Sequence, residues 1–339
     1  MTGHNILGDA EWLPHRYDET QDSFRFRHLP RDAQRNVTFL TDEYLDRSQR
    51  EVAVAAASID RAALPAGPVH FVFHSAYCCS TLAARMFDAP GYAMGLKEPV
   101  VLNDIVGWRR RGAQPQKVAA TLDTALALLA RPLEGDGAVV VKPSNIVYSL
   151  APAILGLRPQ ARAILLYAPI GDFLASIAVK GLWGRRWVRQ ALFGQMQDGV
   201  LAQQFSPAEM FELTDLQVAA LGWLSHHAIY RQMQQRFGSQ RVVICDSQSL
   251  LAEPEKTVEK FFGHFELHPT RDERAAIASG PAFTRNSKDQ SAYSRDDRER
   301  QIAATREANS DEIAKVAEWV GVVAEGIGVD IAPAASALR

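Results

Sequence analysis

The chain has 339 residues, of which 47% are hydrophobic and 22% are charged, and its 37 lysines and arginines nearly balance 39 aspartates and glutamates. This is globular composition, and it excludes a disordered, collagen-like or coiled-coil chain. The length allows one large α/β domain or two smaller ones, each with a sizeable core. A net charge of −2 gives no global reason to expect a nucleic acid or a membrane surface as partner, although a local basic groove remains open. We therefore expect neither partner.

Cysteine usage and the ends of the chain bear on the compartment. Cys78, Cys79 and Cys245 cannot form a disulfide framework, and two of them are adjacent. The first residues include acidic side chains and no apolar segment, so no secretory signal is visible. The apolar stretch 316–332 is interrupted by acidic residues and is too polar to span a bilayer. These features predict a cytoplasmic protein.

Residues 1–65 combine mixed charge with scattered aromatic side chains and predict an N-terminal extension packed on the main domain. The alanine-rich end of this extension predicts a helix that stops at the breakers Pro65, Gly67 and Pro68. From residue 66 onward, short apolar runs alternate with helical patterns. We expect strands or short extended segments at 69–74, 92–96, 138–142, 161–167 and 241–245. We expect helices over 80–87, in two stretches before residue 138, over 145–156, through Ser176, over most of 187–236 and from about Pro254.

This alternation is typical of a parallel sheet with crossover helices. We therefore predict an α/β protein with three layers, α/β/α, around a central and mainly parallel sheet. Residues 66–339 form the main domain in this prediction, with a helical insertion around 183–236. No repeat or low-complexity tract marks a further boundary.

The turn after the strand at 69–74 is a candidate anion site. Ligands of α/β sheets bind beyond the carboxyl ends of strands, where helix N-termini offer N–H donors. The nucleoside-triphosphatase pattern G-x-x-x-x-G-K-[ST] is not matched, because His74 and Cys79 stand at its glycine positions and Ser80 at its lysine position. Only Thr81 fits, so magnesium-dependent hydrolysis of a nucleoside triphosphate is disfavoured. An ordinary strand-to-helix turn capped by Ser80 is the alternative.

Four stretches of the chain resemble the sulfotransferases in order and spacing, from about residue 69 to 293. FVFHSAYCCSTLAAR is similar to the family's 5′-phosphosulfate loop, G-S-P-R-S-G-T-T-L. The stretch from VVVKPSN to GDFLAS is similar to its K-x-P-x-N, P-x-A-R-x-I and D-x-x-x-S elements. VVICDSQSLLAEPEKTVEKFFGHFEL is similar to its Y-E-D-L-L-x-D-P segment with the following helix, and TRNSKDQ to its R-S-x-x-Q element.

The resemblance implies a P-loop-like sulfotransferase architecture. It also implies transfer of a sulfuryl group from 3′-phosphoadenosine 5′-phosphosulfate to a hydroxyl or amine acceptor, a reaction that needs in-line placement, charge stabilisation and a base. No metal is required if cations and N–H donors suffice. For the cradle of the phosphosulfate we expect the backbone N–H groups and hydroxyls of the loop formed by Ser75, Ala76, Tyr77, Cys78, Cys79, Ser80 and Thr81. The acceptor, a small molecule or a peptide, and the oligomeric state stay open.

Three residues are candidates for catalysis by the same resemblance. Lys142 matches a lysine that supports the transferring group in tyrosylprotein members, and a surface lysine at a strand end is the alternative. Glu98, in GLKEP, matches the catalytic glutamate and would act as general base; the alternatives are a solvated Glu beside Lys97, and His74 as a rival base. Ser287 matches the late serine of the family. It would donate to the sulfuryl group or the leaving phosphate, unless it lies in an ordinary polar loop.

The cofactor phosphates should also meet cations. Arg285 and Lys288 flank Ser287 and are expected to contribute charge to the donor. In the family's 3′-phosphate motif an arginine and a serine act together, because a phosphate dianion favours a bidentate cation and a hydroxyl. Here Ser176 keeps the serine position, but Ala168 stands at the arginine position, and Tyr77 replaces a basic residue of the loop. A basic run, Lys180, Arg185, Arg186 and Arg189, either compensates or forms a solvated face.

Cys78 and Cys79 suggest a further hypothesis. A thiol at a helix N-terminus becomes nucleophilic, although small buried cysteines in a tight turn are the more common case. The sequence therefore leaves three hypotheses: a sulfotransferase, a non-catalytic protein of the same fold that binds a nucleotide or a partner, and a thiol-based enzyme. Trp183 and Trp187 are expected to pack a core or to cover the acceptor cleft.

Overall fold

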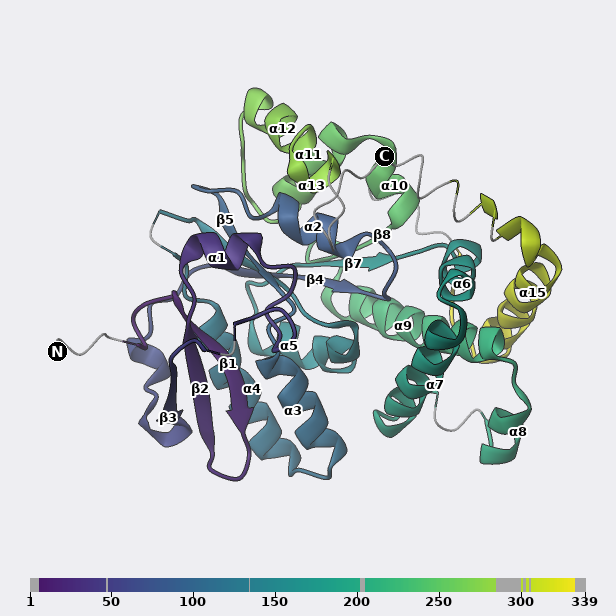
Figure 1. Ribbon diagram of the computed structural model, residues 1–339, viewed down its shortest axis with the longest axis horizontal. Helices are drawn as coiled ribbons and strands as arrows, with labels where there is room; N and C mark the ends of the chain where they lie inside the picture. The colour runs from purple at the N-terminus through teal and green to yellow at the C-terminus, as the bar shows by residue number, and fades with distance from the viewer. Residues whose placement is uncertain are drawn as a thin grey trace.

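A five-stranded parallel sheet with the strand order β5-β6-β4-β7-β8 runs through the molecule (Figure 1). The computed structural model describes residues 6–46, 48–133, 135–201, 205–284, 300, 303–304 and 306–332. Every residue of four of the strands is buried, which explains why these strands read as uninterrupted apolar runs. The strands are β4 (Val69–His74), β5 (Ala93–Lys97), β6 (Ala138–Lys142), β7 (Ala163–Tyr167) and β8 (Val242–Asp246).

Helices cover both faces of this sheet, and Figure 1 shows α2 and α10 to α13 on one side with α3, α4, α5 and α9 on the other. The predicted three-layer α/β/α class is therefore confirmed. The helices of the two layers are α2 (Ser80–Met86), α3 (Val101–Arg110), α4 (Pro115–Leu129), α5 (Ala151–Leu157), α9 (Asp215–Phe237), α10 (Ser247–Ala252), α11 (Pro254–His264), α12 (Arg271–Ala278) and α13 (Pro281–Thr284). The helix expected over 145–156 begins as a 3-10 helix, Asn145–Leu150, before α5.

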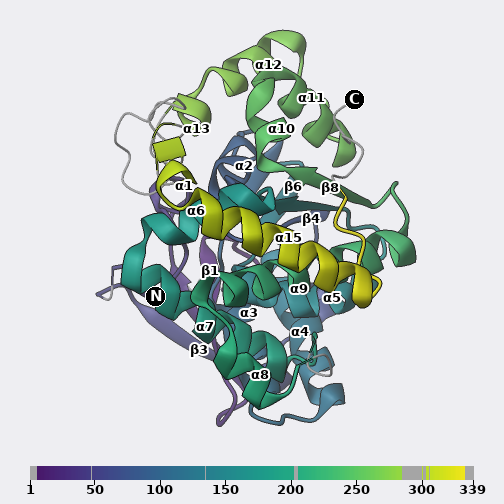
Figure 2. The same ribbon diagram turned by 90° about the vertical axis from the view of Figure 1, so that its right-hand side faces the viewer.

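Further helices lie at one end of the sheet: α6 (Ile170–Val179), α7 (Gly181–Gln197), α8 (Pro207–Glu212) and α15 (Ser310–Gly326). Helix α7 packs along α9, and α15 packs against α9 and α6 (Figure 2). The helical character expected for 187–236 is confirmed by α7, α8 and α9. None of the helices in the described part of the chain is long and apolar enough to cross a membrane.

The N-terminal residues form a separate antiparallel sheet, β1-β2-β3, together with the short helix α1 (Arg31–Asn36). The predicted alanine-rich helix is wrong, because its first part is strand β3 and the rest forms two short 3-10 turns. Val52 and Val54 of β3 pair with Phe26 and Phe24 of β2. Strand pairing thus overrides the helix propensity of alanine. The strands are β1 (Trp12–Asp18), β2 (Ser23–His28) and β3 (Glu51–Ala55).

Two buried cations tie this N-terminal layer to the main domain. The Arg131 guanidinium, 1% exposed, donates to main-chain carbonyls on both sides of the junction, those of Ile6, Leu7, Asp9, Trp12 and Leu128. The Lys97 ammonium, at the end of β5, donates to the carbonyls of Gln34 and Arg35 at the end of α1. Burial lowers the pKa of Arg131 to about 10 and that of Lys97 to about 8. Each cation satisfies carbonyls that a helix end or a loop would otherwise leave unpaired.

Candidate functional site

Three side chains meet where β4, β5 and β6 end. Lys97 pairs with Lys142 in the register of β5 and β6, so Glu98 and Lys142 leave the same edge of the sheet. The Lys142 Nζ donates a hydrogen bond to Glu98 Oε1 and forms an ion pair with it. His74 Nε2 lies 3.9 Å from the same oxygen. The structure therefore brings two of the three predicted catalytic residues together.

The two charges of this pair differ in exposure. The Lys142 side chain is 1% exposed and the Glu98 side chain 18% exposed, so the ammonium lies behind the carboxylate. The contacts of the Glu98 carboxylate with Lys142 and His74 both use Oε1, and among the described residues no hydrogen bond is formed to Oε2. A carboxylate with one oxygen bound to a buried cation and the other open can accept a proton from a hydroxyl or an amine.

The backbone at these strand ends adopts a conformation that L-residues seldom take. Seven non-glycine residues of the described chain have positive φ, and four of them lie here: Ala76, Tyr77, Cys79 and Glu98, with φ between 54° and 71°. Left-handed backbone costs about 1 kcal/mol or more for such residues, and strain of this kind clusters at functional sites. The Glu98 N–H donates to the Lys142 carbonyl at 2.7 Å, which holds Glu98 in that conformation.

His74 is not available as the rival base. Its Nδ1 accepts the Ala76 N–H at 3.1 Å, so the ring proton belongs on Nε2, which donates to the Pro143 carbonyl at 3.1 Å. Burial, with the nearby Lys142 charge, holds the pKa of His74 well below its usual value. His74 is thus a neutral ring that braces the loop after β4 and faces Glu98.

The predicted phosphosulfate loop joins β4 to α2, but some of its N–H and thiol groups already donate hydrogen bonds within the protein. The Ser75 N–H donates to the Leu166 carbonyl, and the Ala76 N–H is bound by His74. The Cys78 thiol is 1% exposed and donates to the same Leu166 carbonyl at 3.5 Å. Of the predicted cradle, Ser80 and Thr81 form the first two residues of α2, and both are buried.

Tyr77 is an aromatic residue at the position where the sulfotransferase loop motif has a basic residue. Its ring packs edge-on against Trp187 of α7 and against Phe173 of α6, at centroid distances of 5.5 and 6.1 Å. Burial raises the pKa of Tyr77 to about 12, so its phenol is neutral at physiological pH. Trp183 stacks on the outer face of Trp187 and is 61% exposed. Trp187 therefore packs on the loop through Tyr77, while core packing or cover of an acceptor cleft stays a prediction for the two tryptophans.

The predicted 3′-phosphate motif needs an arginine and a serine, and this chain has only the serine. Ala168 is fully buried, and its carbonyl accepts the Trp223 indole N–H at 2.8 Å. Ser176 is buried in α6, one helical turn beyond Phe173 and hence on the face of α6 that turns toward the loop. Of the two motif positions, one therefore keeps its serine and the other holds a buried alanine in place of an arginine.

Two of the four side chains of the basic run already form ion pairs within the protein. Arg185 and Arg189 pair with Asp215 at 3.5 and 2.6 Å, whereas Lys180 and Arg186 are exposed. Arg285, Ser287 and Lys288 lie outside the described residues. The chain enters that stretch from α13, which packs against α2.

The N-terminal layer contributes to the site in a way that no sequence pattern indicated. The Phe39 ring lies over the Lys142 ammonium, with 5.1 Å from Nζ to the ring centroid. Tyr44 packs edge-on against Phe39 at 5.3 Å. Burial raises the pKa of Tyr44, and the negative charges of Glu43 and Glu98 add to the shift. Because these residues are remote from Glu98 and Lys142 in sequence, only the tertiary structure shows their proximity.

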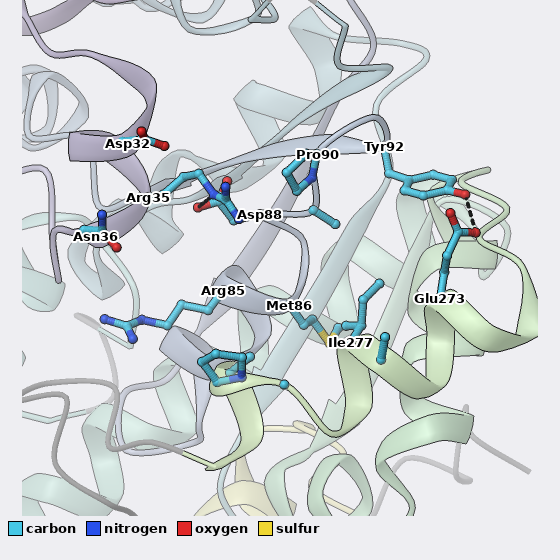
Figure 3. Close-up of a pocket in the computed structure, with 15 residues that line it drawn as sticks. Asp32, Arg35, Asn36, Arg85, Met86, Asp88, Pro90, Tyr92, Glu273 and Ile277 are labelled. Carbon is cyan, nitrogen blue, oxygen red and sulfur yellow. Dashed lines mark hydrogen bonds and ion pairs between the residues drawn. The ribbon is translucent and has the colours of Figure 1, made fainter.

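Two other features lie apart from these strand ends. A cavity of about 570 Å³ opens between α1, the last turn of α2 and α12–α13, and among the described site residues none lines it (Figure 3). Arg35 reaches Asp88 there at 3.7 Å, and the Tyr92 hydroxyl donates to Glu273. In the N-terminal layer Asp9, Glu11 and His28 bring potential metal ligands within 4.8 Å of one another.

Comparison with known proteins gives structural relatives only. No protein-family model and no curated protein matches the sequence. The structure is similar to a sulfotransferase domain of the curacin biosynthetic pathway, at 15% identity and a TM-score of 0.38 over 66% of this chain and 81% of that one.

 A sulfotransferase from Mycobacterium avium matches at 11% identity and a TM-score of 0.43, over 73% of this chain and 78% of that one. A sulfotransferase domain of a Synechococcus olefin synthase matches at 12% identity and a TM-score of 0.41, over 76% of this chain and 95% of that one.

The resemblance to sulfotransferases predicted from the motifs is thus confirmed as a likeness to solved sulfotransferase structures.

Proposed function

We propose that the protein transfers a sulfuryl group from 3′-phosphoadenosine 5′-phosphosulfate to a hydroxyl or amine acceptor, in the cytoplasm. The observation that supports this most is the Glu98–Lys142 pair, which lies beside the end of β4 where the candidate phosphosulfate loop begins. The pair combines an open carboxylate oxygen with a buried cation. These are the two groups that a sulfuryl transfer requires next to its donor.

In the proposed reaction the acceptor lies between Glu98 and the sulfur of the donor. Glu98 takes the proton of the acceptor hydroxyl or amine as the acceptor atom bonds to sulfur. The bond between sulfur and the bridging phosphate oxygen breaks, and 3′,5′-adenosine bisphosphate leaves with its electron pair. Lys142 offsets the negative charge that develops on the transferring group, and Ser80 and Thr81 are proposed to hold the 5′-phosphate.

A non-catalytic protein of the same fold is the second candidate. Two observations favour it: the aromatic Tyr77 and the buried Ala168 stand where the motifs place cations. A thiol-based enzyme has less support, because Cys78 is buried and its thiol is engaged with the Leu166 carbonyl.

Nucleotide binding tests the donor part of this proposal. A ligand present at about 100 times its Kd adds about 2.7 kcal/mol to the stability of the folded state, so 3′,5′-adenosine bisphosphate should raise the thermal midpoint by several degrees. Adenosine 5′-monophosphate, which lacks the 3′-phosphate, is the comparison. Thr81→Val should reduce the shift, because Thr81 is proposed to hold the 5′-phosphate, whereas Lys117→Met, at an exposed position of α4, should not. No shift with either nucleotide would contradict the proposal.

A further inference from the structure

The segment 38–45 of the N-terminal layer is hydrogen-bonded to the turn that carries Glu98. The Leu40 N–H donates to the Lys97 carbonyl at 2.7 Å, and the Val100 N–H donates to the Leu40 carbonyl at 3.4 Å. Leu40 is therefore bonded to the main chain on both sides of Glu98. This places its neighbour Phe39 next to the Glu98–Lys142 pair.

The Lys142 ammonium has two partners of different kinds. It binds the Glu98 carboxylate, and it lies over the face of the Phe39 ring, 5.1 Å from Nζ to the centroid. A cation–π contact is stronger when the cation is desolvated, and the Lys142 side chain is only 1% exposed. The ring thus stabilises the ammonium where water cannot.

The same segment is anchored to the rest of the N-terminal layer through Asp42. His15 Nε2 lies 2.7 Å from Asp42 Oδ1, and the Arg16 guanidinium binds both Asp42 and Asp104 of α3. Tyr44 packs edge-on against Phe39 and supports its ring from the side. These contacts of Asp42 and Tyr44 therefore hold Phe39 in position.

We propose that Phe39 is a positioning residue, whose ring face holds the Lys142 ammonium against Glu98. Its catalytic consequence rests on the proposed function, whereas the contact itself does not. Loss of the ring should displace the ammonium and reduce kcat, because a misplacement of about 1 Å can cost about 100-fold in rate. The KM for the donor should change little, since Phe39 is expected to act on the transferring group through Lys142.

A double-mutant cycle on thermal stability tests the contact without any activity. Phe39→Leu should lower the midpoint in the native chain but clearly less in Lys142→Met, because the ring then has no cation to hold. Phe24→Leu, in the buried core of β2, is the matched control and should cost the same in both backgrounds. Equal losses for Phe39→Leu in both backgrounds would show that Phe39 only packs, and would overturn the inference.

Activity gives the second readout. Phe39→Leu should reduce kcat at least tenfold, and Phe39→Tyr, which keeps the ring face, should restore it to within about twofold. A Tyr variant as slow as the Leu variant would contradict positioning by the ring. If the native protein transfers no sulfuryl group, the proposed function fails, and the stability cycle alone decides the role of Phe39.

Discussion

Glu98 combines a charged side chain, a left-handed backbone and a buried counter-ion at one position. Its φ is 57°, and its N–H and carboxylate both bind Lys142. A strained residue persists only where its surroundings over-determine it, and here Leu40 and Lys142 hold it from two sides. The carboxylate is thus fixed in place before any ligand binds.

The three cysteines should differ in reactivity according to burial. Cys79 is partly exposed, whereas Cys78 and Cys245 are buried. Burial raises the pKa of Cys245, which disfavours its thiolate. Under iodoacetamide, mass spectrometry of the folded protein should show Cys79 modified at least about tenfold faster than the other two.

Denatured protein, in which all three thiols are accessible, is the control for that labelling. Labelling of Cys78 at the rate of Cys79 would contradict the buried thiol that argues against a thiol-based enzyme. Full activity after alkylation of both Cys78 and Cys79 would remove the thiol hypothesis.

At the scale of elements, the N-terminal layer and the parallel sheet depend on each other. Arg131 binds the start of the chain, and Lys97 binds the end of α1, so both charges are used to join segments remote in sequence. The same layer carries Phe39 over Lys142. Changes in this layer should therefore affect the site as well as stability.

Arg131→Met should destabilise the protein by about 3 kcal/mol or more, because it leaves several buried carbonyls without a donor. Urea unfolding followed by fluorescence measures the loss. Arg111→Met is the matched control: Arg111 is paired with Glu19 at the surface, and its loss should cost less than about 1 kcal/mol. Similar losses for the two variants would contradict the role assigned to Arg131.

The elements that could be predicted from sequence are those whose pattern is local. The strands at 69–74 and 138–142 are apolar along their length because helices cover both faces, and both were predicted with the bounds observed. The N-terminal strand β3 was missed, because its alanines favour a helix and only pairing with β2 decides the outcome. Motif spacing singled out Glu98 and Lys142. The contact between Phe39 and Lys142 depends instead on hydrogen bonds between segments remote in sequence, which motif spacing does not predict.

At the scale of the whole molecule, buried histidines make stability depend on pH. Burial lowers the pKa of His70, His226 and His264 to about 4 and that of His227 to about 3. In the unfolded chain these groups titrate near 6.5. Between about pH 4 and 6.5 the unfolded state therefore binds more protons than the folded state, and stability falls as the pH falls through this window.

We expect a large loss of folding stability at acidic pH. At pH 5 each such histidine costs about 2 kcal/mol, at about 1.4 kcal/mol per pKa unit, and the four together approach the total stability of a typical domain, about 5–15 kcal/mol. The thermal midpoint should fall steeply from pH 7 to pH 5. His227→Phe should flatten this dependence, and replacement of the exposed His268 should not. A midpoint independent of pH over this range would contradict the burial of these rings.

Sulfuryl transfer itself tests the central claim most directly. With ³⁵S-labelled 3′-phosphoadenosine 5′-phosphosulfate and a panel of hydroxyl and amine acceptors, the native protein should transfer label and release 3′,5′-adenosine bisphosphate. Glu98→Gln should lower the rate by about 100-fold or more while the bisphosphate still binds, because the variant keeps the shape of the side chain and loses the base. Transfer by Glu98→Gln at the native rate, or no transfer by the native protein to any acceptor, would contradict the account.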